Sequence, residues 1–391
     1  MARDDVTELL LGGDVMTGRG VDQALPFHCD PLLHEDYVRD ARDYVMLAEM
    51  AHGPFRRPLG FSEVWGDALE ELRRAAPDFR LINLETSATT SDDDWEGKGI
   101  HYRMHPSNVA CLRAAGIQCC SLANNHVLDW GYQGLQDTLD CLAATGIRAA
   151  GAGLDAHEAR APVIHELAPG RRVLVFAMGH WTSGIPPEWA ASAERPGVNL
   201  LSDLTPRTAA EVGERMLAAR RPRDVVVASI HWGANWGLEV PPEEVDFAHS
   251  LIDCGAADVV HGHSSHHVKG IEVFRQKLVL YGCGDLLDDY EGIRGHEEYR
   301  GDLGLMYFAE LEPASGRLRR LEMVPTTVRR FRIARADVAG TLWLRDTLNW
   351  EGRRFGTSVG LTPDGRLVLA WEQHGSERCA NGMSSSPSAG R

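Results

Sequence analysis

The stretch Leu9-Leu10-Leu11-Gly12-Gly13-Asp14 is a short apolar run that ends in two glycines and a carboxylate. A short apolar run bounded by glycine is typical of a buried strand. Comparable runs recur along the chain, and helical patterns closed by glycine separate several of them. The other runs cover residues 81–84, 117–122, 173–178, 225–230, 258–260 and 278–281. This alternation of strands and helices predicts an α/β fold.

Most of these runs end in polar side chains that can bind a metal ion. In an open α/β sheet, ligands bind beyond the carboxyl ends of the strands. If the runs lie side by side, their polar ends converge on one rim of the sheet. The side chains expected there are Asp14, Glu85, Asn125, His126, His231, His263 and His266.

The residue types of this set indicate the kind of metal. Carboxylate, amide oxygen and imidazole suit Mn, Fe, Zn or Mg rather than a metal that prefers thiolate. We therefore expect one or two divalent ions at this rim. Two such ions can polarise a phosphoryl or acyl oxygen and activate water near neutral pH.

Each motif alone also has a structural explanation. Gly13-Asp14 at a strand end is typical of a turn, Glu85 can be a carboxylate at a helix N-terminus, and a lone His231 can be a histidine of the core. The run 261–267 is the strongest local signal, because it holds four histidines in seven residues. We expect His261 and His267 to lie outside the ligand set, because strand alternation would turn them away from His263.

The order of these motifs resembles the calcineurin-like metallophosphoesterases, and more closely their CapA-like branch. That branch is linked to making poly-γ-glutamate capsule material. This resemblance spans about residues 8–310, and the region beyond it also resembles the soluble actinobacterial polyglutamine or polyglutamate synthesis accessory proteins. The stretches that carry the resemblance are Gly13-Asp14-Val15-Met16 with Gly18-Arg19, then Asn83-Leu84-Glu85, then Leu122-Ala123-Asn124-Asn125-His126, and His231-Trp232-Gly233.

The resemblance implies a fold and a division of the chain. It implies a metallophosphoesterase sandwich, in which two central mixed sheets are flanked by helices, over residues 1–310. A small α+β appendage is expected over residues 311–375, with hairpin turns near 313–316 and 363–365 and a helix capped by Asp337. Residues 376–391 are rich in Ser, Gly and Pro, so we expect a disordered tail there.

The resemblance also implies roles for individual residues. Metal would be held by Asp14, Glu85, Asn125, His231, His263 and His266. His126 would act as a general acid toward a leaving group, and Arg19 would clamp an anionic group of the substrate.

Three positions depart from the family pattern. Met16 stands where the usual Asp-x-His opening has its histidine, so one ligand is missing or comes from elsewhere. Ser264-Ser265-His266 replaces the usual His-Pro-His, and Asp285 follows Gly284 where many members have asparagine.

Two functions are compatible with these features. The first is a metal-dependent hydrolase acting on a phosphoester or a γ-glutamyl amide. The second is a non-catalytic accessory protein of polyglutamate synthesis that uses the metal site as an anion pocket. In both cases the partner is an anionic small molecule or polyglutamate, and the synthesis machinery is a candidate partner.

The composition excludes other classes. The net charge of −16 argues against a nucleic-acid binder, which needs a basic surface. No run reaches the roughly 18 apolar residues of a membrane span, so we expect no transmembrane segment and a cytoplasmic location. The eight cysteines form no CxxC pair, and we expect most of them to be buried thiols in a reducing compartment.

Overall fold

The computed structural model describes residues 6–372 of the 391-residue chain. The prediction of a disordered tail over residues 376–391 falls outside this range. All seven cysteines within it are free thiols, and five of them are buried.

The larger sheet is built around β1 (Thr7–Val15). Within the described range it has ten strands, and β1 pairs parallel with β2 and antiparallel with β17. The strand order is β20-β21-β18-β17-β1-β2-β5-β6, with β16 attached to β1 and β19 to β18. The other bounds are β2 (Phe79–Leu84), β5 (Cys119–Ser121), β6 (Arg148–Ala150), β16 (Asp285–Leu287), β17 (Leu303–Glu312), β18 (Arg317–Arg329), β19 (Arg332–Arg335), β20 (Thr357–Leu361) and β21 (Leu367–Trp371).

The second sheet is built around the parallel neighbours β12 and β13. It has seven strands among residues 6–372, in the order β11-β9-β12-β13-β15-β14, with β8 on β9. The bounds are β8 (Val163–Ala168), β9 (Arg171–His180), β11 (Leu200–Leu201), β12 (Val225–His231), β13 (Val259–His263), β14 (Ile271–Phe274) and β15 (Lys277–Leu280). Two short ladders complete the pairing: β3 (Ser87–Ala88) with β4 (Arg103–Met104), and β7 (Ala152–Gly153) with β10 (Gly197–Val198).

The two sheets pack face to face. Leu9 and Leu11 of β1 belong to the same buried apolar cluster as Val225 of β12 and Val259 of β13. Leu10 points the other way and packs in a separate cluster with helices of the first half of the chain. This alternation along β1 is the two-residue period of a strand that is buried on both faces.

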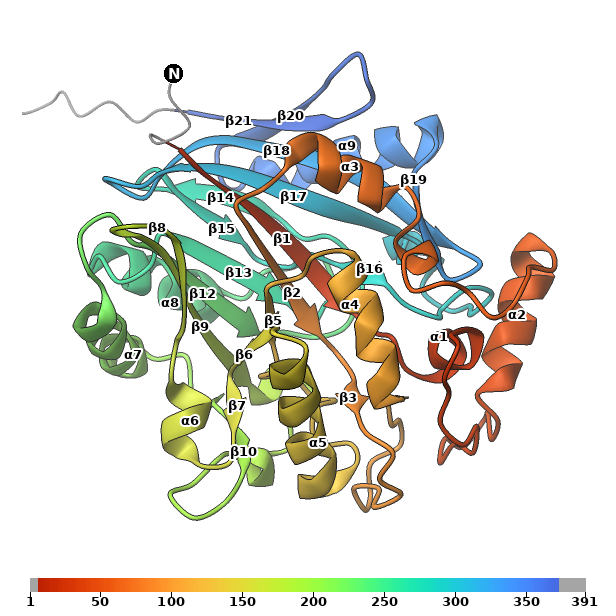
Figure 1. Cartoon of the computed structure of the whole chain (residues 1–391). Coiled ribbons are helices and arrows are strands. Elements are labelled where there is room, and N and C mark those ends of the chain that lie inside the picture. Colours follow the sequence, from red (N-terminus) through yellow and green to blue (C-terminus); the bar gives the residue numbers. More distant parts are fainter. Residues whose placement is uncertain (1–5, 373–391) are drawn as a thin grey trace, which may run out of the picture.

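Helices cover the outer faces of both sheets (Figure 1). The first sheet is covered by α3 (Ala68–Ala75), α4 (Ala110–Ala114) and α5 (Gly131–Ala144), and the second by α7 (Pro206–Ala219) and α8 (Pro242–Asp253). The expectation of a mixed α/β chain with several mixed sheets and flanking helices is confirmed. The other helices are α1 (Arg19–Ala24), α2 (Arg42–His52), α6 (Ala156–Arg160) and α9 (Val338–Gly352), with short 3-10 turns at Glu63–Trp65, Pro106–Val109, Trp181–Ser183, Pro187–Trp189 and Glu297–Tyr299.

The C-terminal part of the chain continues the first sheet. β17 crosses residue 310 and pairs with β1, and β18 and β21 extend the sheet from there. The two expected C-terminal hairpins are present as β17–β18 and β20–β21. The division of the chain at residue 310 stays a prediction. Residue 310 lies inside β17, a strand of the main sheet.

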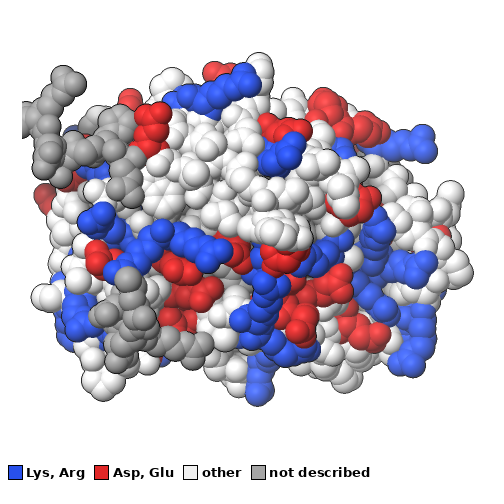
Figure 2. Space-filling model, turned by 90° about the horizontal axis from the view of Figure 1, so that it is seen from above, with Lys and Arg blue, Asp and Glu red and all other residues white. Residues whose placement is uncertain are grey.

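The surface seen from above in Figure 1 carries interleaved charges (Figure 2). Acidic and basic side chains near β18 and β21 pair with one another, for example Arg335 with Glu71 and Arg74 with Asp364. This face therefore offers no extended patch of one sign. None of the helices within residues 6–372 combines the length and apolar character that a membrane span requires.

The cap of α9 generates a stability prediction. The Asp337 side chain accepts a hydrogen bond from the Gly340 N–H at 2.8 Å, as expected from the sequence. Asp337→Ala removes this acceptor and should lower the free energy of unfolding in urea by about 1 kcal/mol. Val338→Ala, at the neighbouring exposed position, is the control and should change little. Equal stability of Asp337→Ala and the parent chain would show that the cap contributes nothing.

Candidate metal centre

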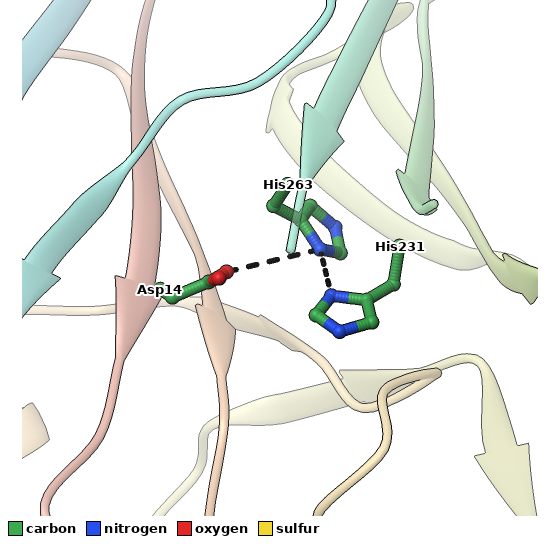
Figure 3. Close-up of side chains that lie close together, drawn as sticks. All are labelled: Asp14, His231 and His263. Atoms are coloured by element: carbon green, nitrogen blue, oxygen red, sulfur yellow. Dashed lines mark hydrogen bonds and ion pairs between the residues drawn. The ribbon is translucent and has the colours of Figure 1, made fainter. Parts of the chain in front are cut away.

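The candidate site lies where the ends of the two sheets meet. Asp14 comes from the end of β1 in the first sheet, and His231 and His263 end β12 and β13 in the second. The β12–β13 register pairs His231 directly with His263. Figure 3 shows the ring of His263 between the carboxylate of Asp14 and the ring of His231. Pairing within one sheet and packing between two sheets therefore create this group of three.

The distances in this group suit one bound cation. His263 Nδ1 lies 2.8 Å from His231 Nδ1 and 3.9 Å from Asp14 Oδ1. Atoms that bind one ion at about 2.0–2.2 Å lie within roughly 4.4 Å of each other. One atom from each of the three side chains lies within 4.8 Å of the others. All three residues are buried, so a cation placed there would be largely shielded from water.

A chain of hydrogen bonds fixes the tautomer of His263. His261 Nε2 lies 2.8 Å from the Gly12 carbonyl oxygen, which can only accept, so this nitrogen carries the proton. Burial lowers the pKa of His261 to about 4, so the ring is neutral and its Nδ1 accepts from the Ser229 hydroxyl. The Ser229 oxygen then accepts from His263 Nε2 at 2.9 Å. The lone pair of His263 Nδ1 is left facing Asp14 and His231.

His231 presents its lone pair to the same point. Its Nε2 lies 3.0 Å from Asn125 Oδ1, an acceptor, so the proton of the neutral ring sits on Nε2. Burial, and after it the nearby histidines, hold the pKa values of His231 and His263 well below their usual range. Two bare imidazole nitrogens thus face each other beside a carboxylate. A cation resolves this repulsion, and neutral imidazole is the form that binds metal.

Two further carboxylates crowd Asp14. Burial and the neighbouring Asp285 raise the pKa of Asp14 to about 7. Burial and Asp14 raise the pKa of Glu85 well above its usual range, and the two side chains share a hydrogen bond. Asn83 Nδ2 donates to Asp14 Oδ1 at 2.8 Å and lies 3.5 Å from Glu85 Oε2. Without a cation, burial of this acid pair favours a shared proton.

Glu85 and His266 lie beside the group of three rather than within it. Glu85 contacts Asp14 and lies 3.7 Å from His126 Nε2. His266 lies on another side of Asp14, where its Nδ1 is 3.1 Å from both carboxylate oxygens of Asp285. Their roles as metal ligands stay predictions.

His126 sits next to the centre and is held by its own partners. Its Nδ1 lies 2.7 Å from Asp129 Oδ2 and 3.1 Å from Lys98 Nζ, and its ring stacks on Tyr102. Lys98 Nζ in turn lies 2.6 Å from Asp129 Oδ1. Burial and the Lys98 charge hold the pKa of His126 well below its usual range. The ring is therefore neutral, with Nε2 turned toward Glu85.

Arg19 is engaged by the protein itself. Its guanidinium donates to Asp289 through Nε and Nη2, and to Glu35 and Tyr44 through Nη1. The side chain is buried and its guanidinium lies 3.9 Å from the Tyr44 ring centroid. The predicted role of Arg19 as a substrate clamp stays a prediction, and these contacts favour a structural role.

A cavity of about 940 Å³ opens beside the centre. Its lining includes Asn125, His126 and His266, which lie next to the group of three. Its walls come from segments far apart in the sequence, and they include Lys98, Tyr102, Trp236, Tyr290, Arg294 and Arg329. The cavity volume is at the upper end of the range for small-molecule sites. A ligand much larger than water can therefore bind next to the candidate centre.

Sequence reasoning missed several residues that shape the site. The expectation that strand alternation turns His261 away from His263 was wrong, because residues two apart on a strand share a face. Asp285 ends a polar cluster after an apolar run, which was a usable signal. Lys98 and Ser229 gave no such signal in the sequence, because a lysine in a loop and a serine inside a strand are common.

The assignment of the histidines generates a prediction. His263→Ala should weaken binding of Zn or Mn more than about tenfold, because it removes a bare nitrogen from the group of three. The control is His267→Gln. His267 accepts from the Gly237 N–H and donates to the Val268 carbonyl oxygen, and a glutamine amide can do both. Metal binding followed by calorimetry should be nearly unchanged in the control. Equal losses in both variants would contradict the assignment.

Comparisons with known proteins agree with this reading of the sequence. Residues 8–290 match the model of the family described as "Bacterial capsule synthesis protein PGA_cap". The chain is 49% identical over 366 residues to a probable polyglutamine synthesis accessory protein of Mycobacterium tuberculosis, covering 93% of this chain and 96% of that protein. It is 28% identical over 216 residues to the PGA biosynthesis protein CapA of Bacillus subtilis, covering 55% of this chain and 54% of that protein. The chain therefore belongs to the bacterial capsule synthesis protein family PGA_cap, and its resemblance to CapA-like proteins is confirmed.

Proposed function

We propose that this chain is a metal-dependent hydrolase of polyglutamate or polyglutamine synthesis, acting in the making of a capsule or cell-wall polymer. It would cleave a phosphoester or a γ-glutamyl amide bond. The observation that carries the proposal is the pair of bare Nδ1 atoms of His231 and His263, which face the Asp14 carboxylate. Their neighbours Asn125, His126 and His266 line a large cavity. The packed pair of mixed sheets is compatible with a calcineurin-like metallophosphoesterase fold.

The residues present fit a divalent ion. Asp14, His231 and His263 would hold it, with the Asn125 amide oxygen close by. A carboxylate and two imidazoles suit Mn, Fe or Zn better than Mg. When bound, such an ion would supply Lewis acidity that polarises a phosphoryl or acyl oxygen. Glu85 would support the centre through its hydrogen bond to Asp14.

His126 is the residue we assign to proton transfer. Its neutral ring can accept a proton at Nε2 and then deliver that proton to a leaving group. Asp129 accepts from Nδ1 and fixes the ring orientation. Lys98, bound to Asp129, holds the same carboxylate in place. The sequence predicted that His126 acts as a general acid. Because its resting ring is neutral, His126 must first accept a proton before it can donate one.

The cavity favours an anionic ligand with more than one charged group. Arg294 and Arg329 line it, and neither makes an ion pair with any residue of the described range. The other lysine and arginine side chains of the wall are engaged: Arg19 with Asp289, Lys98 with Asp129, and Arg300 with Asp302. The guanidinium groups of Arg294 and Arg329 suit carboxylate or phosphate, which bind arginine through two parallel hydrogen bonds. Acidic side chains, among them Asp288 and Glu297, line the same cavity. Polyglutamate offers a row of carboxylates.

The link to polymer synthesis rests on the relatives. One is named for accessory function in polyglutamine synthesis and another for PGA biosynthesis. The stretches of this chain that resemble CapA-like proteins include Asp14 and His231 of the candidate centre. We therefore propose the same process for this chain, with the synthesis machinery as its partner.

A non-catalytic accessory function is the second candidate. The word "accessory" in the name of the M. tuberculosis relative favours it. In this case the same centre and cavity would bind polyglutamate without cleaving it. The two candidates differ in turnover and agree on metal and anion binding.

An activity measurement separates them. We expect the protein loaded with Mn or Zn to hydrolyse a phosphodiester or a γ-glutamyl oligomer. His126→Asn should lower kcat by about 10²–10⁴-fold, because it removes the proton-transfer group, while bound metal stays near the parent level. His249→Asn, on α8 away from the cavity, is the control and should keep the parent rate.

Two results would contradict the hydrolase. One is a fully metal-loaded parent chain that turns over neither substrate class. The other is an unchanged kcat in His126→Asn. Tight binding of γ-glutamyl oligomers without cleavage would support the accessory function instead.

A further inference from the structure

Two tyrosines connect His126 to His266 along the cavity wall. The Tyr102 ring stacks on His126, with ring centroids 3.8 Å apart and an angle of 21° between the planes. The Tyr290 ring meets His266 edge to face, with centroids 5.2 Å apart. The two tyrosine hydroxyl oxygens lie 2.8 Å from each other, which is hydrogen-bond distance. All four residues line the same cavity, so the tyrosine pair borders the space that a ligand would occupy.

This pair has one hydrogen more than it can use internally. Each phenol hydroxyl carries one hydrogen and can also accept a hydrogen bond. One hydrogen is used between Tyr102 and Tyr290, and the hydroxyl that accepts it keeps its own. Within residues 6–372, neither hydroxyl makes another hydrogen bond to the protein. One O–H group at the cavity wall can therefore donate to a ligand oxygen.

Both hydroxyls carry their hydrogen near neutral pH. Phenols lose it only near pH 10, and burial raises the pKa of Tyr102 and Tyr290 further. The Arg19 guanidinium carbon lies 4.7 Å from the Tyr102 ring centroid and 5.7 Å from that of Tyr290. Its charge acts in the opposite direction to burial and to the nearby Glu85, and it makes both phenols stronger donors. Arg19, which pairs within the protein, thus supports the two hydroxyls from behind.

The protein fixes both tyrosines through their backbones. The Tyr102 N–H donates to Asp129 Oδ2 at 2.6 Å, and the same oxygen binds His126 Nδ1. One carboxylate therefore positions both Tyr102 and the His126 ring. The Tyr290 N–H donates to Asp288 Oδ1 at 2.8 Å. A donor that is held in place before the ligand arrives needs no reorganisation when the ligand binds.

Exposure distinguishes the two hydroxyls. Tyr102 is 4% exposed, whereas Tyr290 is partly exposed in the segment that follows β16. A ligand in the cavity meets the more accessible side chain. The order in which Tyr102 donates to Tyr290 leaves the unused hydrogen on that accessible side. A hydroxyl that accepts one hydrogen bond also becomes a stronger donor in the next.

We propose that the Tyr290 hydroxyl donates a hydrogen bond to an anionic oxygen of the ligand, either phosphoryl or carboxyl, and that Tyr102 is its positioning residue. The inference rests on the proposed function, because such an oxygen must enter the cavity. The contact holds the ligand oxygen near His126, the group assigned to proton transfer. Neither tyrosine belongs to a motif that the sequence singled out.

The test measures ligand binding by calorimetry, with the full-length chain supplied with Mn. The probes are inorganic phosphate and, in a separate titration, a γ-glutamyl oligomer. Tyr290→Phe should weaken binding of at least one probe about tenfold, because it removes a hydrogen bond to a charged group. A loss with one probe alone identifies the class of oxygen that Tyr290 binds. Tyr102→Phe should weaken the same binding about threefold, since the ring still stacks on His126 and only the orienting hydroxyl is lost.

The double variant separates a positioning residue from a second donor. If Tyr102 acts through Tyr290, the variant with both Phe substitutions binds the probe as Tyr290→Phe alone does, within about twofold. It should also fold, because replacing both partners of a hydrogen bond by apolar rings of the same shape is nearly neutral.

Tyr299→Phe is the matched control. Tyr299 lies further along the same segment and stacks on His267, a contact that phenylalanine keeps. Within residues 6–372 the cavity lining does not include it. This variant should keep the parent affinity. Melting temperatures show whether each variant is folded.

Four results would overturn parts of this account, and they differ from one another. Parent affinity for both probes in Tyr290→Phe would refute the inference and leave the hydrolase intact. A further loss in the double variant would refute the positioning role of Tyr102. An equal loss in Tyr299→Phe would show that the effect does not come from the cavity hydroxyl. A parent chain that binds neither probe would refute the anion site, and the proposed function with it.

Discussion

The hydrogen bond from His261 Nε2 to the Gly12 carbonyl oxygen joins the two sheets at the base of the site. Gly12 belongs to β1 and His261 to β13, so this contact fixes the end of one sheet against the end of the other. It also starts the relay through Ser229 that leaves His263 Nδ1 unprotonated. The chemistry of the candidate centre thus depends on how the two sheets pack.

Buried negative charge is the second constraint. Asp14, Glu85 and Asp285 lie close together with little solvent around them. Burial raises the pKa of Asp14 and Glu85, so the protein without metal favours holding protons between these groups. A divalent ion supplies the same compensation more strongly, and metal binding then releases protons. Metal affinity should therefore be coupled to pH and to the stability of the fold.

Much of the fold could be predicted from the sequence, because the central strands contain apolar runs that are bounded by polar or glycine residues. β1, β2, β9, β12, β13 and β15 all coincide with such runs. The order of sheets and the pairing of β16 with β1 could not, since β16 has only three residues and its partner is about 270 positions away.

Site residues could be predicted where a motif lies at the end of a strand. They could not be predicted where the packing of distant segments determines which groups a side chain contacts. Asp14, His231 and His263 end their strands and lie together as expected. Arg19 looked available in the sequence, but its guanidinium pairs with Glu35 and with Asp289, which is 270 residues away along the chain. His261 looked like a bystander, and only the contact between the sheets gives it a part in orienting His263.

The central claim is that the Asp14, His231 and His263 side chains bind a divalent ion. Anomalous diffraction from crystals grown with Mn tests it most directly. The account predicts an anomalous peak about 2.0–2.3 Å from the Asp14 carboxylate and from one nitrogen of each imidazole. An ordered crystal without a peak at this point, or with Mn bound only elsewhere, would contradict it.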